Sequence, residues 1–199
     1  MLFRILKFLK RKIVFILFLW PSIIKFRVLS TCSNIEGKAR YNQAVQANGN
    51  GKIIFGKNVK LGCNPSPYLY TGSIYIEARN QISKIEFQDN VWVNNGCIFI
   101  AEGEGILIGA NSLIGTCCEF IDSDFHDLHP HNRLTGSPAV KPVTIGKNVF
   151  IGNNVKILKG VSIGNNSVVA NGSVVTKSIP ENVIAGGSPA RIIKGIEEL

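Results

Sequence analysis

The three histidines of this 199-residue chain, His126, His129 and His131, all fall within one stretch of six residues. An imidazole exchanges a proton near neutral pH and also binds metal ions, so such a cluster predicts either proton transfer or metal ligation. A catalytic zinc site draws its imidazoles from separated parts of a fold, and three in one short segment argue against it. Acid–base chemistry is therefore favoured, with a zinc enzyme as the weaker alternative.

The residues after the histidines follow a six-residue repeat. An aliphatic side chain recurs at every sixth position: Ile145, Ile151, Ile157, Ile163, Val169 and Val175. Gly, Asn and Lys fill the positions between, and these residues tolerate tight turns. A period of six fits neither an α-helix nor a plain strand. It predicts an all-β fold, a parallel β-helix with three short faces per coil, whose coils stack about 4.8 Å apart.

The same period is weaker in the first half of the chain and stops at the histidines. Phe87, Val93 and Phe99 are six residues apart, whereas residues 30–80 hold the pattern poorly. Between Phe120 and Ile145 the repeat is interrupted by the segment that carries all three histidines. A loop of about 20 residues in a compact repeat is unusual unless it functions. An ordinary β-sandwich would not keep one period over six consecutive hexads.

Residues 1–30 differ from the rest in charge and hydropathy. They carry seven of the 22 basic residues and no acidic residue, which leaves 15 basic and 13 acidic residues in 31–199. The apolar run from Ile13 is interrupted at Pro21 and is shorter than the roughly 20 residues of a spanning helix. We expect an amphipathic helical segment on the inner membrane surface, not nucleic-acid binding. Packing against a trimer partner is the alternative.

The sequence thus divides into three segments. Residues 1–30 form the basic apolar segment, residues 31–187 the β-helix with loop 121–142, and residues 188–199 a C-terminal helix. Ser188 and Pro189 resemble an N-cap and first-turn proline, so the helix is expected to cap the last coil. The cysteines lack metal-like spacing and are expected to be core or turn residues in a reducing cytosol: Cys32, Cys63, Cys97, Cys117 and Cys118.

Three motifs carry a family resemblance. They are P-V-x-I-G-x-N-V-x-I-G from Pro142, T-K-S-I-P from Thr176 and A-G-G-S-P-A-R from Ala185. Together with the histidine loop they resemble the maltose/galactoside O-acetyltransferase family of hexapeptide-repeat enzymes, particularly the colanic-acid-type exopolysaccharide O-acetyltransferases. The likeness covers roughly residues 85–196. It implies a left-handed β-helix, a homotrimer, acetyl-CoA as co-substrate, no metal, and a sugar hydroxyl of a surface polysaccharide, glycan or lipid-linked precursor as acceptor.

The resemblance also implies roles for individual residues. His126 stands seven residues before Arg133, as does the family's catalytic base before an arginine. Contacts with acetyl-CoA are implied at Asn153, Asn171, Thr176, Lys177, Arg191 and Lys194. Contacts with the acceptor are implied at Asn94, Trp92, Glu102 and Arg133. The family often has alanine at the position of Asn171, so its contact is expected through the backbone.

The implied chemistry suits these residue types. A hydroxyl is a poor nucleophile near neutral pH, and a histidine base contributes about 10²–10⁴-fold to such a reaction. The thioester is already activated, and a backbone N–H is expected to stabilise the oxyanion. Either Asp122, Asp124 or a backbone carbonyl could orient the imidazole. N-acetyl transfer to an amino sugar and a non-catalytic glycan-binding β-helix are the remaining alternatives.

Overall fold

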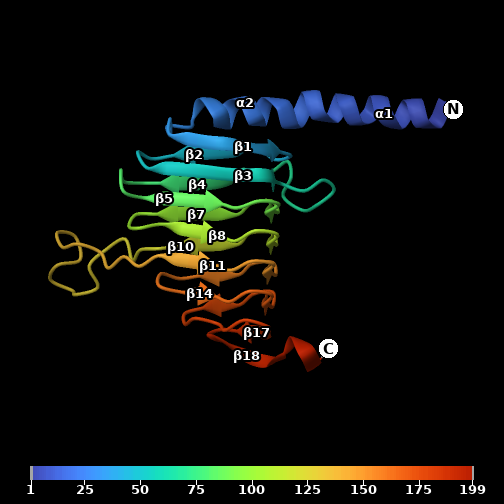
Figure 1. The fold of residues 1–199 in the computed structure, drawn as a ribbon. Helices are drawn as coiled ribbons and strands as arrows, with labels where there is room; N and C mark the ends of the chain where they lie inside the picture. The colour runs from blue at the N-terminus through green and yellow to red at the C-terminus, as the bar shows by residue number, and fades with distance from the viewer. Residues whose placement is uncertain (1, 199) are drawn as a thin grey trace.

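The computed structural model describes residues 2–198, which form a stack of parallel β-coils with a helix across its N-terminal end (Figure 1). The helix has three parts: α1 (Leu2–Val14), the π-helical turn η1 (Phe15–Leu19) and α2 (Trp20–Val28). Its C-terminal end is fixed to the stack because the Ser30 hydroxyl accepts a 2.9 Å hydrogen bond from the amide of Ala47. α1 projects beyond the stack. The N-terminal helix expected from the sequence is confirmed.

The strands lie on three faces. The first face contains the first half of β3 (Lys52–Leu61), β5 (Lys84–Phe87), β8 (Ile106–Ile108), β11 (Val143–Ile145) and β14 (Ser162–Ile163). The second contains the second half of β3, β6 (Trp92–Val93), β9 (Leu113–Ile114), β12 (Phe150–Ile151), β15 (Val168–Val169) and β17 (Val183–Gly187). The third contains β2 (Val45–Asn48), β4 (Ile74–Ala78), β7 (Ile98–Ala101), β10 (Glu119–Ile121), β13 (Lys156–Ile157) and β16 (Val174–Val175). β1 (Ile35–Tyr41) pairs with β3.

The strand register confirms the six-residue repeat. Ile145 pairs with Ile163 and Ile151 with Val169, so each residue meets the one three hexads later on the next coil. The repeated aliphatic residues are buried along the axis of the stack. Four phenylalanines continue this core toward the N-terminus, with ring centroids 5.5, 4.9 and 4.7 Å apart from Phe55 through Phe87 and Phe99 to Phe120. Cys97 and Cys118 are also buried in this core.

The turns explain the Asn and Gly of the repeat. Asn148 and Asn166 have φ values of 55° and 59°, and their side chains are joined by a 3.0 Å hydrogen bond between coils. Asparagine tolerates this left-handed conformation better than most residues. A Cβ at Gly115 would lie 2.6 Å from the backbone of Gly152 on the next coil, so no larger residue fits there without a shift. The turn residues are therefore set by the close stacking of the coils.

One stripe of large apolar side chains faces outward along the second face. Trp92 pairs with Leu113, Leu113 with Phe150, and Phe150 with Val168 on successive coils. Trp92, Leu113 and Phe150 are 38%, 47% and 50% exposed. We call Trp92, Leu113, Phe150 and Val168 the second-face stripe. Contiguous exposed apolar surface of this kind marks an interaction site.

The C-terminal helix predicted over 188–199 is wrong. The chain instead turns back after Gly187 and forms β18 (Ala190–Gly195), which pairs antiparallel with β17, followed by the 3₁₀ turn η2 (Ile196–Glu198). β17 would otherwise present unpaired backbone groups at the end of the second face. Ile192 and Ile193 are β-branched and suit a strand, and Gly187 adopts a φ of +102° at the reversal.

Candidate functional site

Loop 122–142 leaves the stack after β10 and returns at β11, and Figure 1 shows it projecting from one side. Its two ends are held together, since the amide of Lys141 donates to the carbonyl of Asp122 at 2.8 Å. The coil continues on either side, with Phe120 of β10 stacked on Ile157 of β13. The loop is thus an insertion on an unbroken core, as the interrupted repeat predicted.

His126 is exposed in this loop and has one ring nitrogen engaged. Its Nδ1 lies 3.2 Å from the backbone carbonyl oxygen of Arg133. A carbonyl oxygen only accepts hydrogen bonds, so Nδ1 is the donor in this contact, and in the neutral imidazole Nε2 then keeps the lone pair. This contact joins residues seven positions apart, which gives a physical reason for the spacing between His126 and Arg133. Of the three ways to orient the imidazole, the backbone carbonyl is the one observed.

Asp122 and Asp124 have other partners. The buried carboxylate of Asp122 accepts hydrogen bonds from the amides of Glu102, Gly103 and Gly105, at 2.7, 3.0 and 3.0 Å. Burial raises the pKa of Asp122, and the three amide donors oppose that shift. Asp124 forms an ion pair with Lys159 of the next coil, 3.0 Å between Oδ2 and Nζ. Both aspartates therefore hold the base of the loop and not the imidazole.

An ionic cluster that no motif in the sequence marks supports the same end of the loop, where it joins the stack. Arg79 contacts Glu77 at 2.9 Å and Glu102 at 3.3 Å, and its guanidinium lies 4.9 Å from the centre of the Phe125 ring. Burial alone would raise the pKa of Glu77, but hydrogen bonds from Arg79 and Tyr75 hold it below its usual value. Glu102 also accepts a hydrogen bond from Ser123. Glu102, which was predicted to contact the sugar that accepts the acetyl group, therefore lies beside the histidine loop.

The other two histidines do not share this arrangement. The rings of His129 and His131 lie 5.4 Å apart at the exposed end of the loop. The amide of His129 donates to Asp127, a local turn contact of 2.8 Å. Within residues 2–198, no three His, Cys, Asp or Glu side chains gather as metal ligands would.

Most of the other predicted residues lie at two corners of the stack. The histidine corner is made of the turns after the third-face strands, including loop 122–142, and the amide corner of the turns after the second-face strands. Glu102, Thr176 and Lys177 lie at the histidine corner. Asn94, Asn153 and Asn171 lie at the amide corner. A single chain therefore does not bring all the predicted contacts together.

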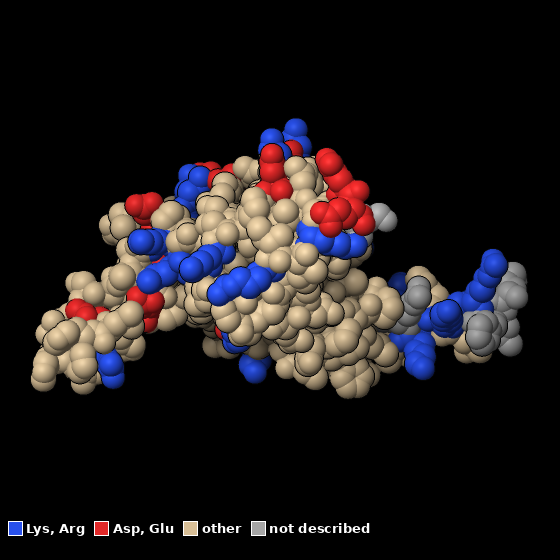
Figure 2. Space-filling view, turned by 90° about the horizontal axis from the view of Figure 1, so that it is seen from below, with Lys and Arg blue, Asp and Glu red and all other residues tan. Residues whose placement is uncertain are grey.

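Two of the residues predicted to bind acetyl-CoA line the same cavity near the C-terminal end of the chain. Lys177 and Arg191 both line a hollow of about 470 Å³ between the last coil and β18. Thr176 is exposed beside Lys177. Lys194 lies toward the other end of β18, opposite Ile184, with its ammonium 3.5 Å from the carbonyl of Glu198. Figure 2, viewed from the C-terminal end, shows basic side chains on this surface and on the projecting helix.

Two of the three amide-corner residues form hydrogen bonds with neighbouring coils. Asn153 Oδ1 accepts a 2.8 Å hydrogen bond from the amide of Thr116, and Asn171 Oδ1 accepts one of 2.7 Å from the amide of Asn153. Asn94 Oδ1 accepts from the adjacent amide of Asn95 at 2.8 Å. Each of these side-chain oxygens already accepts one hydrogen bond within the protein, so the side-chain NH₂ groups are the more available partners for a ligand. Trp92 lies on the second face, with Lys60 4.6 Å above its ring.

Comparison with known proteins gives consistent matches. Residues 142–177 match the family model described as the hexapeptide repeat of succinyl-transferase. The chain is 41% identical over 153 residues to WbbJ of Escherichia coli K12, named as a lipopolysaccharide biosynthesis O-acetyl transferase, with 72% of each chain covered. It is 42% identical over 116 residues to the acetyltransferase YJL218W of Saccharomyces cerevisiae. The chain spans 58% of the length of that relative and 58% of the length of a second curated acetyltransferase.

A solved structure extends these matches to the fold. The hexapeptide-repeat acetyltransferase VCA0836 of Vibrio cholerae, crystallised with acetyl-coenzyme A, superimposes with a TM-score of 0.58 at 31% identity. The match covers 70% of this chain and 69% of that one.

Proposed function

This chain belongs to the hexapeptide-repeat acetyltransferases of the maltose/galactoside O-acetyltransferase family, and we propose that it transfers an acetyl group from acetyl-CoA to a sugar hydroxyl. The observation that carries the proposal is His126, whose Nδ1 meets a backbone carbonyl so that Nε2 is free to act as a base. The left-handed sense of the β-helix belongs to the same proposal. The acceptor is a surface polysaccharide or its lipid-linked precursor, in keeping with the name of the WbbJ relative.

The proposed reaction needs one proton acceptor and no metal. Nε2 of His126 accepts the hydroxyl proton as the oxygen attacks the thioester carbonyl and the new C–O bond forms. The C–S bond then breaks, and the imidazolium returns the proton to the departing CoA sulfur. The fixed tautomer keeps the lone pair of Nε2 available at each turnover, because Nδ1 stays committed to the Arg133 carbonyl.

A homotrimer would complete the site. The second-face stripe supports this assembly, because its large exposed side chains need a partner surface and a second copy of the chain supplies one. In a three-fold ring the second face of one subunit meets a different surface of the next subunit. We place the neighbour's histidine corner, which lies on the opposite side of the stack from the second face, against the amide corner. Asn94, Asn153 and Asn171 would then face His126 of the other subunit. This arrangement accounts for predicted contacts that one chain keeps apart.

The N-terminal helix supports a location on the inner membrane surface. Within residues 2–198 no helix is both long and apolar enough to cross a bilayer. The helix nevertheless exposes many large apolar side chains, among them Phe8, Leu17 and Phe18 at 57%, 61% and 60%. Seven basic residues and no acidic residue in 1–30 favour an anionic surface. Nucleic acid is not part of the proposal.

The donor site is tested by removing the two cations that share the C-terminal cavity. Lys177→Ala combined with Arg191→Ala should raise the KM for acetyl-CoA about tenfold or more, with a smaller effect on kcat, because each charged contact to a phosphate is lost in ground and transition states alike. Free CoA should raise the Tm of the natural protein by mass action and lose this effect in the double variant.

The matched control removes two exposed turn lysines elsewhere. Lys57 and Lys147 lie at the corner between the first and second faces, and their hydrogen bonds to neighbouring coils are made by backbone N–H and C=O groups. Lys57→Ala with Lys147→Ala should leave the KM and the CoA-induced rise in Tm unchanged. A natural protein whose Tm ignores millimolar CoA, or equal losses in both double variants, would contradict the donor site.

A further inference from the structure

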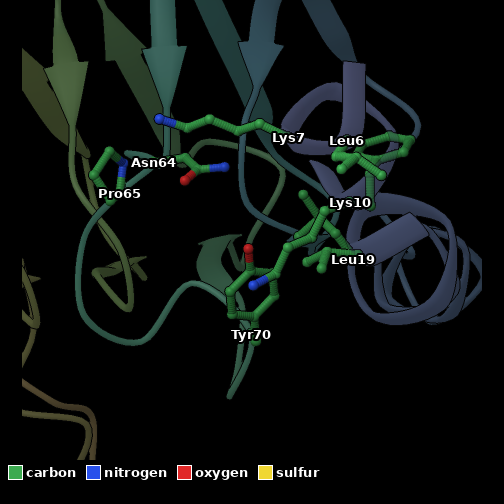
Figure 3. A pocket seen from close by; sticks show the side chains of 9 residues that line it. Leu6, Lys7, Lys10, Leu19, Asn64, Pro65 and Tyr70 are labelled. Carbon is green, nitrogen blue, oxygen red and sulfur yellow. The ribbon is translucent and has the colours of Figure 1, made fainter. Parts of the chain in front are cut away.

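A hollow lies between the N-terminal helix and loop 62–73 (Figure 3). Its volume is about 800 Å³, in the range of small-molecule sites. Its apolar wall is made of Leu6, Val14, Phe15, Leu19, Pro65 and Tyr70. Leu19 is 6% exposed, so this part of the apolar wall is almost wholly buried.

Two lysines make the hollow amphipathic. Lys7 and Lys10 line it from the helix, and Figure 3 shows the Lys7 side chain reaching across toward Asn64. Among the lining residues the structure describes, there is no carboxylate, and residues 1–30 contain none either. Two ammonium groups at an apolar cavity complement a ligand that joins an anionic head to a hydrocarbon chain. A purely apolar or a cationic ligand would leave both lysines uncompensated.

The second wall of the hollow is a firmly held loop. Loop 62–73 is anchored by Asn95, whose Nδ2 donates to the carbonyls of Cys63 and Pro67 at 3.0 and 2.8 Å. Gln43 adds a 2.7 Å hydrogen bond to the carbonyl of Tyr68. The wall is therefore a fixed surface and does not depend on ligand to form.

These contacts also fix the position of the hollow relative to the proposed site. Asn95 is the neighbour of Asn94, and loop 62–73 follows the second-face half of β3, so the hollow lies at the N-terminal end of the amide corner. A ligand held there would lie at the end of the corner that carries Asn94, Asn153 and Asn171. The surrounding helix exposes Phe8, Leu9 and Ile13, which would place the opening at a lipid surface.

We propose that this hollow binds the lipid phosphate carrier of the acceptor, with the hydrocarbon chain against the apolar wall and the phosphate between Lys7 and Lys10. The inference rests on the proposed function, because it assigns the lipid-linked form of the acceptor to that site. The hollow would hold the acceptor at the membrane while its sugar reaches Asn94. Free glycan would lack this contact and would react without it.

The test uses the full chain and two double variants that remove equal charge from the same helix. Lys7→Gln with Lys10→Gln changes the hollow, whereas Lys12→Gln with Lys25→Gln changes lysines that do not line it. Each protein is titrated with phosphatidylcholine vesicles that contain a long-chain polyprenyl phosphate. It is also titrated with phosphatidylcholine vesicles in which phosphatidylglycerol supplies the same surface charge. Inorganic phosphate serves as a soluble competitor.

The natural chain and the Lys12/Lys25 variant should both prefer the polyprenyl phosphate vesicles. The Lys7/Lys10 variant should lose roughly tenfold or more of its affinity for them and keep no preference, because the two ammonium contacts to the bound phosphate are lost. The Lys12/Lys25 variant should lose only general attraction to charged lipid, by a similar factor on both kinds of vesicle. An equal loss of preference in both variants, no preference in the natural chain, or full competition by inorganic phosphate would overturn the proposal.

Acetyl transfer to a soluble glycan separates this inference from the proposed function. Lys7→Gln with Lys10→Gln should leave that activity unchanged. If the natural chain binds polyprenyl phosphate but acetylates no glycan, the proposed function fails while the lipid site stands. If it acetylates soluble glycan and shows no preference for polyprenyl phosphate, the lipid site alone is wrong.

Discussion

His126→Ala should lower kcat by about 10²–10⁴-fold, because the variant loses the only base proposed for the acceptor hydroxyl. The side chain is exposed in an inserted loop, and the ends of that loop are held by Asp122 and Lys141. Folding and assembly should therefore be unchanged. Steady-state kinetics with acetyl-CoA and a sugar acceptor, alongside circular dichroism and mass measurement in solution, check both parts of the expectation.

Three companion variants sharpen this result. His129→Ala and His131→Ala should cost far less, since these rings lie at the exposed end of the loop. Arg133→Ala keeps the backbone carbonyl that meets Nδ1, so it should keep most of kcat even if acceptor binding weakens. Equal losses from all three histidines would contradict the assignment of the base. A loss from Arg133→Ala as large as that from His126→Ala would contradict orientation by the carbonyl.

Leu113→Glu combined with Phe150→Glu should dissociate the trimer and abolish most of the activity. The two side chains are paired neighbours on the second-face stripe, so two charges would be forced into the proposed interface. Separated subunits would lose the neighbour's His126, and activity should fall by about the same 10²–10⁴-fold as removal of the base itself. Sedimentation equilibrium and kinetics on the same sample measure both effects.

The control places the same charges on another face. Thr144 and Ser162 are paired neighbours pointing outward from the first face, and their replacement by Glu adds an equal charge pair. This variant should remain trimeric and active. A monomeric natural protein, or a fully active monomer of the Leu113/Phe150 variant, would show that the site is not shared between subunits.

The regular part of the fold could be predicted because it is local and periodic. From Ile145 to Val175 each hexad repeats the same burial, and the strand register follows from that period alone. The Gly and Asn of the turns were predictable for the same reason. The N-terminal helix was predictable from its length, charge and apolar content, and the insertion from the break in the period.

Features set by contacts distant in sequence could not be predicted. β18 forms because β17 offers an open edge, whereas the local sequence at Ser188 and Pro189 favoured a helix start. Arg79 meets Glu102 across 23 positions of sequence, and no motif marks that pair. The carbonyl that orients His126 belongs to the backbone, so residue types carry no sign of it. The hollow beneath the helix depends on loop 62–73, which lies outside the regular hexads.

The central claim, acetyl transfer from CoA to a sugar hydroxyl, is tested by the chemical linkage of the product. Purified full-length protein is incubated with acetyl-CoA and de-O-acetylated surface polysaccharide, and the glycan is analysed by mass spectrometry before and after mild alkali. We predict that the glycan gains acetyl groups in step with the release of free CoA thiol, and that alkali removes them as it removes any ester. Acetyl groups that resist alkali would identify an amide and an amino-sugar acceptor, and no gain of acetyl at all would contradict the enzyme itself.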